Sequence, residues 1–104
     1  MVHQEYNIPS LHNNKSITFD LRYNEDLKKK PLIIFLHGFK GFKDWGHFNM
    51  IADYFVNQGF AFLKMNFSHN GTSPEQLIDF VDLEAFGQNN FSIELDDVLS
   101  LIHI

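Results

Sequence analysis

The residues best placed to do chemistry follow an apolar run in the first half of the chain. Leu32–Leu36 (LIIFL) contains no polar residue, which is typical of a strand covered on both faces in a mainly parallel sheet. The segment His37-Gly38-Phe39-Lys40-Gly41 comes directly after it, and loops at the carboxyl ends of such strands are where α/β proteins bind ligands. His37, Gly38 and Gly41 are expected to shape this turn, because glycine adopts positive φ at little steric cost. The sequence therefore predicts a ligand-binding turn at residues 37–41.

Two other kinds of chemistry were weighed against this pattern. His37, His47 and His69 are candidate zinc ligands, since neutral imidazoles bind zinc readily, but none shows the short paired spacing H-x-x-x-H. A serine nucleophile on a tight elbow needs G-x-S-x-G, and the nearest segment, Gly71-Thr72-Ser73-Pro74-Glu75, lacks the second glycine. We therefore expect no metal, no cofactor and no nucleophilic serine in this chain.

Strand patterns lie on both sides of the central run. Glu5–Ile8 and Ser16–Tyr23 are compatible with β structure and are separated by the turn-rich segment 9–14. In the second of them apolar residues alternate with polar ones, which predicts one buried face, one solvent-facing side and a place near a sheet edge. The alternating residues are Ile17, Phe19 and Leu21 against Thr18, Asp20 and Arg22. Phe60–Phe67, apolar except for Lys64 and Asn66, is expected to be another buried strand.

A helix is expected between the two apolar strands, which makes a βαβ crossover. Asp44 has the side chain of an N-cap, and Gly59 is a typical C-terminal stop. Five apolar residues recur at helical spacing and are expected to face the core: Trp45, Phe48, Ile51, Ala52 and Phe55.

Two further helices are expected toward the end of the chain. Gln76–Phe86 has partly helical spacing and reads as a short helix or a lid-like insertion that ends at Gly87. The last helix is expected to begin at a cap formed by Asn89, Asn90 or Ser92. Its predicted apolar face consists of Leu95, Val98, Leu99 and Ile102.

From about Ser16 to Val98 the chain resembles the front half of an α/β-hydrolase. The resemblance rests on the apolar strand, the HGFKG turn, the helix start Asp44-Trp45-Gly46 and the second apolar strand. It implies a truncated three-layer α/β/α architecture: a partial hydrolase sheet with an antiparallel N-terminal hairpin, then the βαβ crossover and a following helix. It departs from the family at Asn66 and Ser68-His69, where hydrolases often carry an acidic residue and Arg-Gly.

The activity that this resemblance implies is hydrolysis of carboxylic esters or related acyl compounds by a Ser-His-Asp mechanism. The backbone N–H of Phe39, with Lys40 as the neighbouring candidate, would be one donor of the oxyanion hole. His37 is not the family's catalytic histidine, and the whole triad is expected downstream of this chain, which alone should be inactive. Phe42, Trp45 and His69 are expected to line the entrance of the pocket.

The resemblance also sets the expected domain limits. Residues 1–98 would be the N-terminal part of a single hydrolase domain. Residues 99–104, LSLIHI, equal the translation of CTG TCT CTT ATA CAC ATC, which resembles a transposase adapter of sequencing libraries, so this tail is expected to be a fusion scar. If the natural chain ends here instead, the alternative is a small non-catalytic α/β interaction domain.

Composition narrows the classes of partner. The net charge of -5 and the pI near 5.5 do not indicate the clustered basic residues that bind nucleic acids or anionic membranes. The basic run Lys28–Lys30 is interpreted as a surface turn. No signal-like or membrane-spanning apolar stretch is present, so a cytoplasmic protein is expected. The expected partner is a small-molecule ester or acyl substrate of the full-length parent. Without a following strand, Leu32–Leu36 would be an open apolar edge, which predicts self-association.

Overall fold

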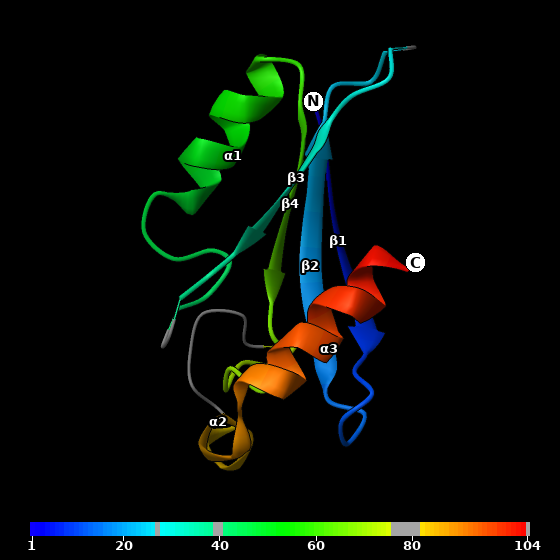
Figure 1. Ribbon diagram of the computed structural model, residues 1–104. Helices are drawn as coiled ribbons and strands as arrows, with labels where there is room; N and C mark the ends of the chain where they lie inside the picture. The colour runs from blue at the N-terminus through cyan, green and yellow to red at the C-terminus, as the bar shows by residue number, and fades with distance from the viewer. Residues whose placement is uncertain (27, 39–40, 76–81, 104) are drawn as a thin grey trace.

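The computed structural model describes residues 1–26, 28–38, 41–75 and 82–103. Within them the chain is a small α/β domain with a four-stranded mixed sheet and three helices (Figure 1). The strands are β1 (Val2–Pro9), β2 (Ser16–Tyr23), β3 (Leu32–Leu36) and β4 (Ala61–Asn66), in the order β1-β2-β4-β3. The helices are α1 (Phe48–Asn57), α2 (Leu83–Gln88) and α3 (Phe91–Ile102). No helix of the described part is long and apolar enough to cross a membrane.

The sheet combines an antiparallel hairpin with a βαβ unit, as expected. β1 and β2 pair antiparallel with Ile8 opposite Ile17, and β2 pairs antiparallel with β4. β3 and β4 are parallel neighbours joined through α1, with Ile34 opposite Leu63. The bounds of β2 and β3 agree with the sequence, whereas β1 is longer than predicted and β4 shorter.

The two larger helices cover opposite faces of the sheet (Figure 1). On the α1 face, Ala52 and Val56 pack with Phe62 of β4. On the other face, Leu101 of α3 packs into a buried cluster whose other members come from β2, from β4 and from the residue that follows β4: Ile17, Phe19, Leu63, Met65 and Phe67. Successive strand residues alternate between these clusters, because neighbouring side chains on a strand point to opposite faces. The three-layer arrangement is therefore present at the scale of this small sheet.

The predicted start of α1 is wrong. Asp44 does not cap the helix; the N-cap position is His47, which makes no side-chain cap bond, and the Asp44 carboxylate binds two lysines instead. Trp45 precedes the helix and is 59% exposed, so it is not part of the core. Ile51 is also exposed, and the residues that α1 buries are Ala52 and Val56. The predicted stop at Gly59 is confirmed by its φ of 95° and by its N–H bond to the Val56 carbonyl at 3.1 Å.

Burial in two strands also differs from expectation. The polar face of β2 is not solvated: Thr18, Asp20 and Arg22 are all buried. Long-range charge partners, which the local pattern does not reveal, cover this face. β3 is an edge strand rather than a fully covered one, and its Leu32 and Leu36 are 51% and 45% exposed.

The segments after β4 agree with the sequence in part. Residues 76–81 of the predicted helix Gln76–Phe86 lie outside the described part of the chain. α2 begins after Asp82, whose carboxylate accepts a bond from the Ala85 N–H at 3.1 Å, and Gly87 lies inside this helix instead of ending it.

α3 begins after Asn90, which is one of the three N-cap residues predicted from the sequence. The Asn90 side chain accepts a bond from the Ile93 N–H at 3.0 Å. The predicted apolar face is wrong, because α3 turns Ile93, Asp97 and Leu101 inward. Of the four residues of the predicted apolar face, three are exposed: Leu95, Leu99 and Ile102. The fourth, Val98, is half-buried.

Candidate functional site

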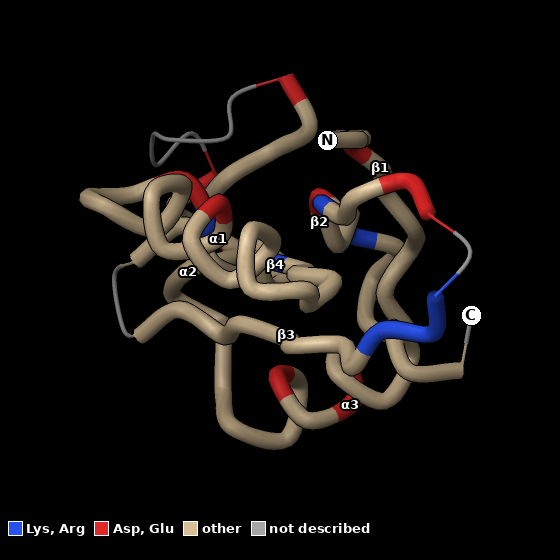
Figure 2. Tube along the Cα trace, turned by 90° about the horizontal axis from the view of Figure 1, so that it is seen from above, with Lys and Arg blue, Asp and Glu red and all other residues tan. Residues whose placement is uncertain are grey.

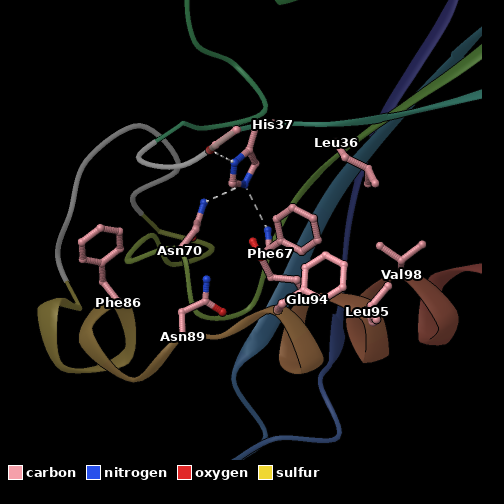
Figure 3. Close-up of a pocket in the computed structure, with 11 residues that line it drawn as sticks. Leu36, His37, Phe67, Asn70, Phe86, Asn89, Glu94, Leu95 and Val98 are labelled. Atoms are coloured by element: carbon pink, nitrogen blue, oxygen red, sulfur yellow. Dashed lines mark hydrogen bonds between the residues drawn. The ribbon is translucent and has the colours of Figure 1, made fainter.

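The turn after β3 is organised around a buried histidine. The His37 ring is 8% exposed, and its Nδ1 lies 2.9 Å from the Gly38 carbonyl oxygen. A carbonyl oxygen only accepts hydrogen bonds, so Nδ1 carries the proton. Nε2 is then the acceptor, and it faces the Phe67 N–H and the Asn70 amide nitrogen, each at 3.4 Å (Figure 3). His37 thus links the end of β3 to the loop that follows β4.

The environment of His37 favours the neutral ring. Burial lowers the pKa of His37 below its ordinary value of 6.5, against smaller opposing effects from the Gly38 carbonyl and from Glu94. The Phe67 ring packs edge-on against the imidazole, with 5.0 Å between ring centroids. The acceptor nitrogen of this ring already faces two N–H donors, so His37 connects the turn to the loop after β4.

Gly41 closes the turn by a close approach rather than by positive φ. Its N–H donates to the Gly38 carbonyl at 2.9 Å. A Cβ at Gly41 would lie 3.0 Å from that carbonyl oxygen and 3.2 Å from the His37 Cβ. The expected positive φ is wrong for both Gly38 and Gly41, and a Cβ at Gly38 would meet nothing within 4 Å. Phe39 and Lys40, the predicted oxyanion donors, lie outside the described residues.

A cavity of about 330 Å³ opens beside this turn (Figure 3). Its walls come from the end of β3, from the loop after β4, and from α2, α3 and the residues between them. Most of the lining is apolar: Leu36, Phe67, Phe86, Phe91, Leu95 and Val98. A concave apolar site with a few converging polar groups is typical of small-molecule binding.

The polar groups of the cavity come from four separate segments. His37 lies at the turn, Asn70 in the loop after β4, Asn89 before α3 and Glu94 in the first turn of that helix. The side-chain Oδ1 of Asn70 also accepts a hydrogen bond from the Thr72 N–H at 3.0 Å. This bond holds the side-chain amide nitrogen of Asn70 toward His37. The Asn89 Oδ1 is buried and has no hydrogen-bond partner among the described residues.

The three residues expected at the entrance of the enzyme's pocket do not line this cavity. Phe42 is buried, Trp45 is exposed to solvent, and His69 is fully buried; none of them borders the cavity. His69 lies instead beside Ser68, with 2.8 Å between its Nδ1 and the serine Oγ, and burial lowers the pKa of its ring. The sequence missed Asn89, Glu94 and the cavity-lining phenylalanines because the loop and helix that carry them are distant from the turn along the chain.

A buried ion cluster attaches the segment after the turn to the sheet. Lys43 and Lys64 are fully buried, and both ammonium groups lie 3.1 Å from the carboxylate of Asp20 on β2. The Asp44 carboxylate bridges the two lysines at 2.8 and 2.6 Å. The Lys43 N–H also donates to the Asn66 side chain at 2.7 Å. The chain after Gly41 is therefore held over β2 and β4, which fixes one end of the turn.

The charges in this cluster support one another. Burial acts to lower the pKa of Lys43, but bonds to Asp44, Asp20 and Glu5 outweigh it and raise the pKa. For Asp44 burial acts in the opposite sense, and Lys43 and Lys64 together bring its pKa below 3.8. The charged forms of Lys43 and Asp44 are thus both favoured.

The three candidate zinc ligands named from the sequence do not form a cluster among the described residues. Across residues 1–26, 28–38, 41–75 and 82–103, the one group of metal-ligating side chains that lie close together is His3, Glu5 and Asp20. It does not include His37, His47 or His69. Lys43 already binds both carboxylates of that group, at 2.9 Å and 3.1 Å, so a metal ion would have to displace an ammonium.

Comparison with known proteins does not assign this chain to a family. No family model matches it, and no curated protein sequence matches it. What the geometry itself defines is a small α/β domain in which a buried histidine follows a parallel strand and borders an apolar cavity.

Proposed function

We propose that this chain is the N-terminal part of an α/β-hydrolase that cleaves carboxylic esters or related acyl compounds by a Ser-His-Asp mechanism. The observation that carries the proposal is the turn at His37–Gly41, which follows a parallel strand and borders the cavity. The antiparallel hairpin followed by a βαβ unit supports it, since this is the order of elements that the resemblance implies.

In the proposed enzyme the chain supplies binding and oxyanion stabilisation. The backbone N–H of Phe39, with Lys40 as the neighbouring candidate, would stabilise the negative oxygen of the tetrahedral intermediate, an effect worth about 2.7–4 kcal/mol per donor. The apolar walls suit the hydrocarbon part of an acyl substrate, and Glu94 disfavours an anionic one. Serine, acid and catalytic histidine would all come from sequence downstream of this chain.

The first experiment is to read the source DNA across the codon for Val98. The proposal expects the frame to continue into a strand, a G-x-S-x-G elbow and later an acid and a histidine. The extended protein should hydrolyse p-nitrophenyl esters, and replacing the elbow serine by alanine should abolish turnover. A genuine stop codon after Ile104, or turnover that does not need the serine, would refute the hydrolase proposal.

A second candidate function is a non-catalytic interaction domain. It is favoured by the apolar side chains that α3 and β3 leave exposed, with Leu99 51% and Leu32 51% accessible to solvent. A stop codon after Ile104 would favour this candidate, whereas a continuing frame with a nucleophile elbow would remove it.

A further inference from the structure

Large apolar side chains are exposed both on the edge strand and on the last helix. We define the β3–α3 surface by its six exposed apolar side chains: Leu32, Leu36, Phe91, Leu95, Leu99 and Ile102. Their exposed fractions lie between 45% and 72%. Leu36 and Leu95 line the same cavity, which joins the strand part to the helix part (Figure 3). Apolar patches of this kind mark interaction surfaces.

The backbone of β3 presents hydrogen-bonding groups to the same side. The Pro31 carbonyl accepts a bond from the Ala61 N–H at 3.0 Å, so residue 31 faces β4. In a parallel pair, alternate residues turn both polar groups to one neighbour, which directs Ile33 and Phe35 to β4 as well. The N–H and C=O groups of the intervening residues, Leu32, Ile34 and Leu36, therefore point to the open edge. Pro31 does not protect this edge, because its missing N–H belongs to the side of β4.

We propose that this 104-residue chain forms a two-fold symmetric dimer in which β3 pairs antiparallel with β3 of a second copy. The pairing is centred on Ile34, which exchanges two hydrogen bonds with the same residue of the second copy. Leu32 then lies opposite Leu36 of that copy, so the two half-exposed leucines cover each other. The two sheets become one sheet without an apolar open edge, and the arrangement closes, as an isologous interface requires.

The helices support the same geometry. Ile34 packs into the cluster on the α3 face, so Leu32 and Leu36, two residues away on either side, point to that face too. Opposite residues of an antiparallel pair share a face. Both α3 helices therefore lie on the same side of the joined sheet.

Charge favours the antiparallel orientation. Lys28–Lys30 lead into the start of β3 and form the blue segment beside that strand in Figure 2. Glu94 lies at the other end of β3, beside the cavity that His37 and Gly38 line. Antiparallel pairing brings the lysine run of one copy near Glu94 of the other, whereas parallel pairing would bring the two lysine runs together. The dimer uses only this edge and α3 of the 104-residue chain, and a longer hydrolase in which a further strand pairs with β3 would not form it.

Sedimentation velocity on the full chain, from about 1 to 100 μM, tests the association. The unaltered chain should shift from monomer to dimer, and Leu32→Lys should raise the dissociation constant at least about tenfold, since a charge on an edge opposes pairing. Leu11→Lys is the matched control, because Leu11 is 78% exposed at the hairpin turn, away from β3. A monomer at every concentration, or equal weakening by both substitutions, would overturn the proposal.

Cysteine cross-linking tests the register independently of stability. The chain has no cysteine, so only introduced thiols can react. Facing residues of a hydrogen-bonded pair have Cα atoms about 5.5 Å apart, which suits a disulfide, so Leu32→Cys mixed with Leu36→Cys should give a mixed dimer. Leu32→Cys alone should not cross-link, since its two copies lie four residues out of register, roughly 13 Å apart. Cross-linking of Leu32→Cys with itself, without the mixed product, would overturn this geometry.

Discussion

Replacing Lys64 by methionine tests how strongly the buried ion cluster holds the turn-bearing segment. The Lys64 side chain is fully buried, and its ammonium lies 2.6 Å from the carboxylate of Asp44 and 3.1 Å from that of Asp20. Methionine preserves much of the volume but removes the charge, which leaves the buried Asp20 carboxylate with Lys43 and Arg22, and the partly exposed Asp44 carboxylate with Lys43. Breaking a buried ion pair in this way costs about 3–5 kcal/mol, so we expect a loss of that size in the free energy of unfolding.

Two further variants decide whether charge burial is the cause. Lys15→Met removes an ion pair of similar length, 2.7 Å to Asp82, but both of its side chains are partly exposed and screened by solvent. It should therefore change stability far less. The double variant Lys64→Met/Asp44→Asn removes one charge of each sign, and its two substitutions should be coupled by about 0.5–3 kcal/mol in the restoring direction.

Urea unfolding followed by far-UV circular dichroism measures all three variants, with a midpoint shift at constant slope as the readout. If Lys64→Met does not fold at all while the double variant does, the same conclusion holds. Equal losses for Lys64→Met and Lys15→Met would refute the reasoning, because burial would then make no difference to the energy of the pair.

Three smaller predictions concern the turn, pH and the last helix. Gly41→Ala should destabilise by about 1–3 kcal/mol in urea unfolding because its Cβ has no room, whereas Gly87→Ala, in α2 with open space, should stabilise by about 0.5–1 kcal/mol. Burial lowers the pKa of His37 and His69, so below pH 6.5 the unfolded chain binds more protons than the folded chain. The free energy of unfolding should therefore decrease as the pH is lowered from 6.5, by about 1.4 kcal/mol per pH unit for each histidine until its folded-state pKa is reached. A midpoint that does not change with pH would contradict this. Asn90→Ala should cost about 1 kcal/mol and lower the melting temperature, since it removes the side-chain cap of α3; Asn90→Asp, which keeps an acceptor, should not.

Local patterns were sufficient where neighbours in sequence determine the structure. The bounds of β2 and β3 followed from alternation and from an unbroken apolar run, and α3 starts after a cap that the sequence offered. The same local reasoning predicted a turn after β3, and His37 and Gly38 of this turn line the cavity. A strand, a cap and a tight turn each depend on a few consecutive residues, so their signals are present in the sequence itself.

Burial was predicted less well, because it depends on which distant segments meet. The polar face of β2 looked solvated, yet Asp20 is fully buried because Lys43 and Lys64, each more than 20 positions away, neutralise it. Asp44 has the side chain of a helix cap but binds those lysines instead.

The sequence by itself determined the order of strands and helices, the hairpin followed by the βαβ unit, and the position of the glycine-closed turn. The tertiary structure alone decided that β3 is an open edge, that α3 turns Asp97 inward and Leu99 outward, and that Asn89 and Glu94 join the cavity. The physical reason is that periodicity marks which residues share a face, whereas the burial of that face depends on charge and shape partners from elsewhere in the chain.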